Sequence, residues 1–169
     1  MEKEIETYVK LSRGDLSEYW FDAYGWIACY FAQLEGLSYA LVDLLSSREE
    51  TPRLNKLPFQ ARTERARELI CNHLRRAGKA SLADEWDALL QDAISAAPLR
   101  NKILHNPLSV NLAIGDPLHD KDAGIILIHE AGQKVFKLDF VQKFAESMRS
   151  LNTRMQDLLV RTQINQDPR

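Results

Sequence analysis

The sequence lacks most features of secreted, membrane-spanning and metal-binding proteins. It has only two cysteines among its 169 residues, and Cys29 and Cys71 are too widely separated to form a zinc-ligand pair or a disulfide framework. No apolar run approaches the roughly 18–20 residues of a membrane span, and residues 1–6 (MEKEIE) lack the basic flank and apolar block of a secretory signal. We therefore expect a cytoplasmic protein without a membrane partner, whose two thiols are buried or half-buried.

The sequence also lacks a large excess of charge of either sign. Its formal net charge is −2, which excludes binding of a polyanion over the whole protein surface. The charges are unevenly distributed, because residues 1–50 carry −6, residues 51–100 carry +3 and the remainder carries +1. The small total therefore leaves room for a local site that binds an anion.

Three common site motifs are absent as well. There is no Gly-rich phosphate loop, no nucleophile elbow and no zinc-ligand spacing, and we expect neither a metal nor a cofactor. Residues 119–122 (HDKD), with Asp116 nearby, superficially suggest a cation site, but they lack an ordered ligand spacing. We expect a solvated loop there.

The pattern that is present is mainly helical, with apolar residues at steps of three and four. The helical segments run from residue 15 to 46, from 58 to 77, from 81 to 105 with an interruption at Pro98, and from 139 to about 161. Pro58 suits a first turn and Gly78 a helix stop, while Thr51 and Pro52 mark a loop. Gly25 and Gly36 predict that another helix backbone approaches the first segment closely.

Residues 108–138 change to a period of two. Runs at 110–114, 125–128 and 134–138, with a hairpin-like connection at 130–133, predict a small antiparallel meander of two or three strands. A polar lead-in covers residues 1–14 and a polar tail covers residues 162–169. The whole chain, 1–169, is thus predicted to be one mainly α domain, a four-helix body with a β insertion before the last helix.

The second helical segment has a basic side. Only Glu64 and Glu68 oppose its six cations, which are Arg62, Arg65, Arg67, Arg75, Arg76 and Lys79. This side either guides an RNA backbone toward a site or is a solvated surface balanced by the acidic first third. Glu35, in the first segment, is either buried against Arg100 or lies at the edge of the apolar stripe.

Residues 98–107 (PLRNKILHNP) place a guanidinium, an amide, an ammonium and an imidazole within six residues at a helix end. Asn101 and His105 are four residues apart, so only about 40° separates them around a helix. Arg100 and His105 are five apart, about 140° around a straight helix. We expect those two to converge only if the helix is distorted or if a second copy of the motif faces the first across a two-fold axis.

This set of side chains suits a phosphodiester. Arginine matches phosphate oxygens and stabilises a phosphorane-like transition state, histidine moves protons near neutral pH, and asparagine orients either partner. RNA supplies an internal nucleophile in its 2′-hydroxyl, so the chemistry needs no metal. On spacing alone, the alternative is a surface ion pair for Arg100 and a helix C-terminal role for His105.

Residues 99–108 (LRNKILHNPL) resemble the motif of the HEPN superfamily, the higher eukaryotes and prokaryotes nucleotide-binding domains. That motif is an arginine, four to six residues and then a histidine, with a polar residue, often asparagine, directly after the arginine. Arg100, Asn101 and His105 fill these positions. The motif also falls late in a helical domain and is followed by another helix, as in the family, whereas the β insertion departs from its minimal bundle.

The resemblance implies a four- to five-helix bundle that pairs as a homodimer, with the two motifs meeting in a composite site. Many relatives are metal-independent endoribonucleases of toxin–antitoxin, phage-defence or RNA-processing systems, which leave a 2′,3′-cyclic phosphate and a 5′-hydroxyl. The prediction is therefore an endoribonuclease in which His105 is general acid or base, Arg100 stabilises the transition state and Asn101 orients.

Further candidate RNA contacts are Lys102, Asn106, Arg75 and Arg76. The predicted partners are RNA, a second copy of the chain and an antitoxin or other partner protein. Two alternatives stay open, since some relatives do not cleave. One is a non-catalytic HEPN-like module that binds RNA, a nucleotide or a protein, and the other is a structural helical dimer.

Overall fold

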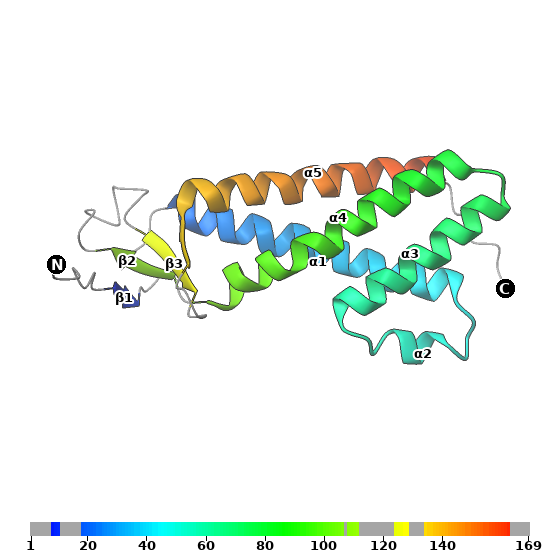
Figure 1. Cartoon of the computed structure of the whole chain (residues 1–169), viewed down its shortest axis with the longest axis horizontal. Helices are drawn as coiled ribbons and strands as arrows, with labels where there is room; N and C mark the ends of the chain where they lie inside the picture. Colours follow the sequence, from blue (N-terminus) through cyan, green and yellow to red (C-terminus); the bar gives the residue numbers. More distant parts are fainter. Residues whose placement is uncertain (1–7, 11–17, 107, 112–123, 129–133, 163–169) are drawn as a thin grey trace. The chain divides into compact units, whose positions relative to one another are not determined.

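The computed structural model of the chain describes residues 8–10, 18–106, 108–111, 124–128 and 134–162. These residues form five helices and four strands (Figure 1). The helices are α1 (Glu18–Leu45), α2 (Thr51–Leu54), α3 (Phe59–Arg76), α4 (Ala80–His105) and α5 (Leu138–Thr162). The strands are β1 (Tyr8–Lys10), β2 (Leu108–Asn111), β3 (Gly124–Ile128) and β4 (Lys134–Lys137). The prediction of a mainly α fold is confirmed.

Helix α3 illustrates how local signals set the ends of the helices. It ends at Arg76, and Gly78 adopts a φ of 73°, in the left-handed region that glycine enters without a Cβ clash. The helix stop predicted at Gly78 is therefore confirmed. Pro58 precedes α3 as its N-cap residue instead of lying in its first turn.

Pro98 does not interrupt the third predicted helix. Helix α4 runs from Ala80 to His105 with Pro98 inside it. Proline removes one helical hydrogen bond, to the carbonyl four residues earlier, but the neighbouring apolar residues Ala97 and Ile103 are buried. Burial of the apolar stripe outweighs the local cost, so no new helix begins at Pro98.

Two short elements lie where the sequence predicts irregular chain. Helix α2 is a single turn that begins at Thr51, and Pro52 suits this position because its φ is fixed near the helical value. Strand β1 lies within the predicted polar lead-in and pairs with β2, with Tyr8 opposite Asn111. Three residues are too few to show a periodicity, so only the pairing with β2 defines this strand.

The four strands form one antiparallel sheet in the order β1-β2-β3-β4. Strands β2, β3 and β4 confirm the meander predicted for residues 108–138. The predicted connection at 130–133, and the loop with Asp116 and residues 119–122, lie outside the described residues. Strand β4 continues directly into α5, where the Phe136 ring stacks on Phe140 with 4.7 Å between centroids.

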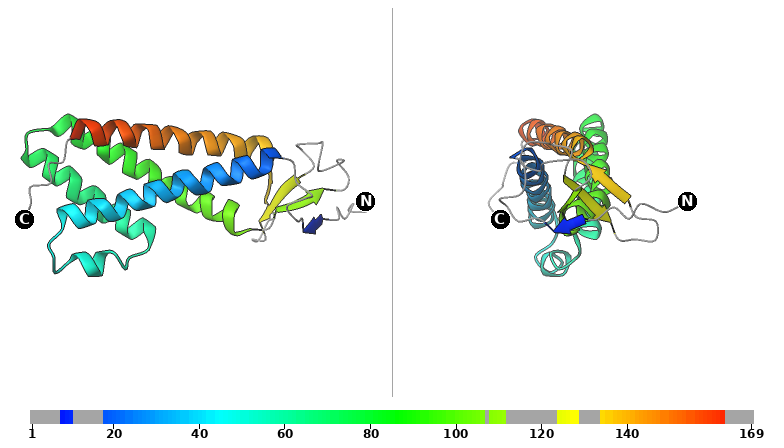
Figure 2. Two further views of the ribbon diagram at one scale, coloured as in Figure 1. Left: turned by 180° about the vertical axis from the view of Figure 1, so that it is seen from behind. Right: turned by 90° about the vertical axis from the view of Figure 1, so that its left-hand side faces the viewer.

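The chain divides into two compact units. The first comprises residues 1–28 and 98–148, the second comprises residues 29–97 and 149–169, and α1, α4 and α5 contribute to both. In the first unit, the N-terminal part of α1 (blue) lies beside the N-terminal part of α5 (orange) in both views of Figure 2. The predicted single domain over residues 1–169 stays a prediction.

Each unit buries its own apolar side chains. Those of the first unit include Trp20, Ala23, Ile27, Ile103, Leu138, Val141, Phe144, Ala145 and Met148. Those of the second include Phe31, Leu34, Leu41, Val42, Leu54, Ala66, Ile70, Leu74, Trp86, Leu89, Leu90, Met155 and Leu158. None of the helices in the described part of the chain is long and apolar enough to cross a membrane.

The second unit also contains a buried arginine. Arg62 is 2% exposed, although its predicted position is on the exposed basic side of α3. Its Nε donates to Ser38 Oγ at 2.9 Å, its Nη1 to the Leu57 carbonyl at 2.8 Å and its Nη2 to Glu35 Oε1 at 3.0 Å. Its Cζ lies 3.5 Å from the centroid of the Tyr39 ring.

These contacts satisfy a charge whose burial without partners would be strongly unfavourable. They connect α3 to α1 and to the segment that precedes α3. They also bear on Glu35, whose carboxylate is half-exposed and pairs with Arg62. That position agrees with the edge of the apolar stripe, one of the two interpretations that the sequence allows.

A second buried polar contact fixes the end of α5. Trp86 and Thr162 are both buried, and the indole Nε1 of Trp86 donates to Thr162 Oγ1 at 2.7 Å. Thr162 is the last residue of α5, so it belongs to the core and not to the predicted polar tail. Residues 163–169 lie outside the described residues.

Two expectations about small residues of α1 are wrong. Gly25 and Gly36 are exposed, and a Cβ built on either meets no atom within 4 Å in the described part of the chain. No helix of that part therefore approaches them closely. Cys29 is exposed, whereas Cys71 is buried, and burial raises the pKa of the Cys71 thiol.

Replacing Arg62 with methionine is expected to lower the free energy of unfolding by about 3 kcal/mol, because three hydrogen bonds are lost and their acceptors stay in place. Urea denaturation measures the change. Arg65→Met is the matched control on the same helix. Its half-exposed ion pair with Glu68 contributes at most about 1 kcal/mol, so equal losses in the two variants would contradict the role of Arg62.

Thr162→Val is expected to lower the free energy of unfolding by about 2 kcal/mol, since the buried Trp86 N–H loses its acceptor at nearly constant side-chain volume. Thr153→Val removes an exposed hydroxyl from the same helix, one that bonds the Arg149 carbonyl, and should change stability by less than about 0.5 kcal/mol. Thermal and urea denaturation of both variants compare them. A Thr162→Val protein as stable as Thr153→Val would show that the indole contact is unimportant.

Candidate functional site

The predicted site residues lie in the last turns of α4, in the first unit. Arg100 is half-buried, and Asn101 and His105 are exposed. Ile103, between them, is fully buried. The helix therefore turns its apolar side to the core here and leaves the amide and the imidazole at the surface.

The structure brings Arg100, Asn101 and His105 together within one chain. Arg100 Nη1 donates to Asn101 Oδ1 at 2.9 Å, and the same nitrogen lies 3.5 Å from His105 Nε2. Five residues correspond to about 7.5 Å along a helix axis, a distance that the long arginine side chain spans. A second copy of the motif is thus not needed to bring the guanidinium to the imidazole, contrary to the expectation for a straight helix.

A hydrogen bond between Arg100 and His105 is possible with only one form of the imidazole ring. A guanidinium has only donors. A hydrogen bond at this contact therefore requires an unprotonated Nε2, with the ring proton on Nδ1. In this arrangement the imidazole is neutral and its Nε2 is the atom that can accept a proton.

The backbone of the last turn of α4 is held by two side chains. The last four carbonyls of a helix have no intrahelical donor. Asn106 Nδ2 donates to the Lys102 carbonyl at 2.7 Å, and the Tyr24 hydroxyl donates to the Ile103 carbonyl at 3.0 Å. Asn106, predicted to contact RNA, thus uses its amide at the helix end, and Lys102 is half-buried beside it.

Tyr24 is a residue that the sequence does not single out. Its partner Ile103 is 79 residues away, and no local pattern indicates this contact. Burial raises the pKa of the Tyr24 phenol. The phenol therefore keeps its proton at neutral pH and is a hydrogen-bond donor there.

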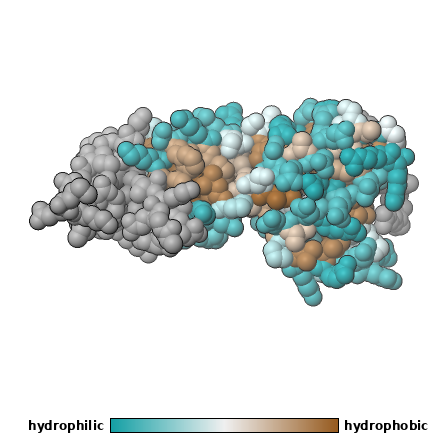
Figure 3. Space-filling model, in the orientation of Figure 1, coloured by the Kyte–Doolittle hydropathy of each residue, from teal (hydrophilic) through white to brown (hydrophobic). Residues whose placement is uncertain are grey.

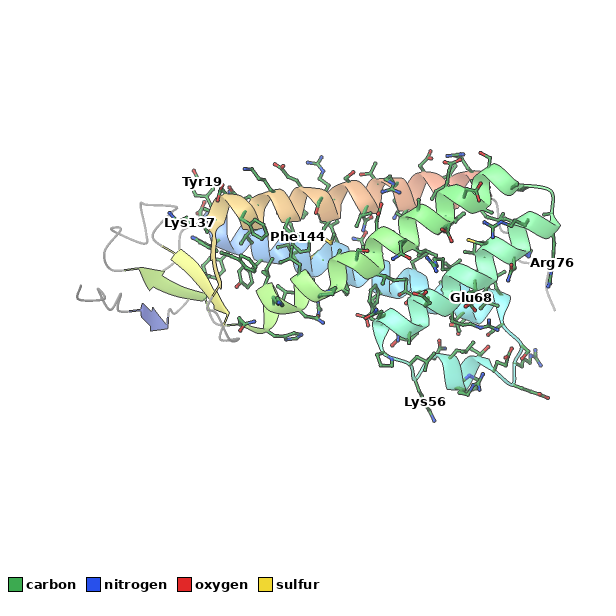
Figure 4. All side chains as sticks on the ribbon, viewed as in Figure 1. Tyr19, Lys56, Glu68, Arg76, Lys137 and Phe144 are labelled. Atoms are coloured by element: carbon green, nitrogen blue, oxygen red, sulfur yellow. The ribbon has the colours of Figure 1, made fainter. Side chains whose placement is uncertain are left out.

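The other two candidate RNA contacts, Arg75 and Arg76, lie at the end of α3 in the second unit. Arg75 Nη2 is 3.0 Å from Asp84 Oδ1, and this hydrogen bond raises the pKa of the guanidinium. Arg76 projects from the C-terminal end of the helix (Figure 4) and forms no ion pair with any described residue. Of the two, Arg76 is the more available to a phosphate.

Much of the predicted basic side of α3 is neutralised by neighbouring carboxylates. Arg65 pairs with Glu68 at 2.7 Å, and Arg67 pairs with Glu64 at 3.1 Å. Figure 3 shows hydrophilic side chains over α3 on the face that it draws. Because Arg62 is also buried, the exposed surface of α3 carries both positive and negative charges. This agrees with the interpretation that the basic side of this helix is a solvated surface.

Metal ligands are not grouped in the described residues, where no set of three or more His, Cys, Asp or Glu side chains is arranged to hold an ion. The chemistry available at the end of α4 is that of a guanidinium, an amide and an imidazole. It suits binding of a phosphate oxygen and transfer of a proton.

Comparisons with known proteins give no family assignment. No family model matches the sequence, and no curated protein or solved structure matches the chain. The HEPN resemblance therefore stays a prediction that depends on residues 99–108.

Proposed function

We propose that this chain is a metal-independent endoribonuclease of the HEPN type that acts as a homodimer. The proposal rests on one observation, which is that Arg100, Asn101 and His105 form one cluster at the end of α4. These are the three positions of the HEPN motif. The same resemblance supports a role as a toxin or defence component, with an antitoxin or other partner protein.

The cluster supports cleavage by the 2′-hydroxyl of RNA. His105 Nε2 takes the proton of the 2′-hydroxyl, and the 2′-oxygen forms a bond to phosphorus. The guanidinium of Arg100 neutralises the charge on the phosphoryl oxygens. The bond from phosphorus to the 5′-oxygen then breaks, and the imidazolium of the second copy's His105 protonates the leaving oxygen. The products are a 2′,3′-cyclic phosphate and a 5′-hydroxyl.

The contact between Arg100 and His105 links substrate binding to this proton transfer. Both side chains are at the surface end of α4, and the contact is long for a hydrogen bond. A phosphate is a stronger acceptor for arginine because it is charged and can bind two N–H groups. When Arg100 turns to the phosphate, it uncovers Nε2 for the 2′-hydroxyl. Asn101, which accepts from Arg100, orients the guanidinium in the absence of RNA.

The first unit also supports self-association. Tyr19 and Trp26 lie seven residues apart on the same side of α1. They are 57% and 53% exposed, and Figure 4 labels Tyr19 near the start of this helix. Large exposed aromatic side chains are enriched at protein interfaces. A homodimer that covers them would remove this apolar surface from water.

One observation favours the alternative of a non-catalytic module. The arginines of α3 are largely paired with carboxylates, which leaves little open basic surface to hold a long RNA. A protein that binds RNA, a nucleotide or a protein partner at Arg100 without cleaving would meet this description equally well. Cleavage assays separate the two.

Purified protein is expected to cleave single-stranded RNA in EDTA, and Arg100→Ala and His105→Ala should each lower the rate by at least about a hundredfold. The reason is loss of charge stabilisation in one variant and of proton transfer in the other. Gel analysis with end-group detection of the cyclic phosphate measures both rates. Arg65→Ala and His73→Ala are matched controls on α3 and should cleave at the wild-type rate.

Two outcomes would contradict the enzyme proposal. One is no cleavage by the wild type over a range of RNA sequences, and the other is equal cleavage by all variants. Binding of RNA that depends on Arg100 without any cleavage would support the non-catalytic alternative.

For RNA binding, Arg76→Ala is expected to weaken affinity more than Arg75→Ala, because Asp84 already neutralises Arg75. Fluorescence anisotropy with single-stranded RNA at several salt concentrations tests this. Loss of one phosphate contact should reduce the slope of log affinity against log salt by about 0.7. A larger effect of Arg75→Ala, or no effect of either variant, would remove the end of α3 from the RNA path.

A further inference from the structure

The carbonyl of Ile103 lacks its regular α-helical donor. A helical carbonyl accepts from the N–H four residues later, and that residue is Pro107, which has no backbone N–H. Water is a poor substitute where the residue is fully buried, as Ile103 is. The carbonyl therefore depends on a donor from another part of the chain.

The Tyr24 hydroxyl is that donor. It lies 3.0 Å from the Ile103 oxygen, and both residues belong to the first unit. Tyr24 is half-buried on α1, directly after the buried Ala23 and three residues before the buried Ile27. Burial raises the pKa of the phenol, so the hydroxyl is protonated at neutral pH and can donate this hydrogen bond from α1 to the last turn of α4.

This bond acts at the centre of the candidate site. Ile103 lies between Asn101 and His105 in the sequence, and its side chain and its carbonyl are both held by the first unit. The position of His105, two residues later, follows from the backbone of this turn.

We infer that Tyr24 is a positioning residue for the Arg100–His105 pair, which it acts on through the Ile103 carbonyl. The catalytic consequence of this inference rests on the proposed function. The placement of His105 relative to Arg100 does not depend on that function and can be measured without RNA.

The experiment is ¹⁵N–¹H NMR of the histidine rings in the full chain, with His105 assigned from a His105→Ala spectrum. Arg100→Ala is expected to shift the His105 Nε2 resonance clearly in the wild-type background. In the Tyr24→Phe background the same substitution should produce less than half of that shift, because the pair is no longer held together. Tyr39→Phe removes a hydroxyl from the same helix, in the second unit, and keeps the ring that Arg62 contacts, so it should leave the full shift.

A second measurement tests the consequence for cleavage. If the wild type cleaves RNA, Tyr24→Phe should lower kcat by about tenfold to a hundredfold with KM nearly unchanged, as expected for misplacement of a reacting group. Tyr39→Phe should retain the wild-type kcat. A loss of stability alone would not lower kcat while leaving KM nearly unchanged, when the assay is run at a temperature at which circular dichroism shows both variants folded.

The results separate this inference from the proposed function. A wild type that does not cleave, together with a reduced Nε2 shift in Tyr24→Phe, would overturn the enzyme proposal and support the positioning role. An undiminished Nε2 shift in Tyr24→Phe would overturn the positioning role, whether or not the protein cleaves RNA.

Discussion

The second unit is organised around one buried positive charge. A guanidinium that is removed from water needs an acceptor for its N–H groups, and Arg62 finds them on Ser38, Glu35 and Leu57. These partners come from α1 and from the segment before α3. Because the guanidinium is planar and its donors have fixed directions, satisfying it fixes how these parts of the unit pack against one another.

The same requirement for polar partners shapes the end of α4. There the groups to be satisfied are backbone carbonyls, and the donors are the amide of Asn106 and the phenol of Tyr24. The turn that carries Arg100 and His105 is therefore supported by the fold, although both side chains reach the surface. A site that moves a proton and binds a phosphate needs such support, because its groups must keep their mutual geometry.

Charge pairing limits where an anionic substrate can bind. The middle third of the chain carries a net positive charge, yet its arginines on α3 are mostly used in pairs with carboxylates or, for Arg62, in the core. Electrostatic attraction is thus local. For the endoribonuclease that we propose, this favours recognition of a single phosphodiester at the end of α4 over extended binding of the RNA backbone.

The sequence by itself determined the elements whose signal is local. Periods of 3.6 and 2 and a glycine stop define α1, α3, α5, the three later strands and the end of α3, and a four-residue spacing places Asn101 and His105 on one side of a helix. Only the tertiary structure decided which partner each isolated polar group takes. Four examples are the burial of Arg62, the bond from Trp86 to Thr162, the pairing of β1 with β2 and the bond from Tyr24 to Ile103. Each depends on residues that lie far apart in the chain. No local pattern encodes such a partner, because it depends on where packing of the apolar core brings distant segments together.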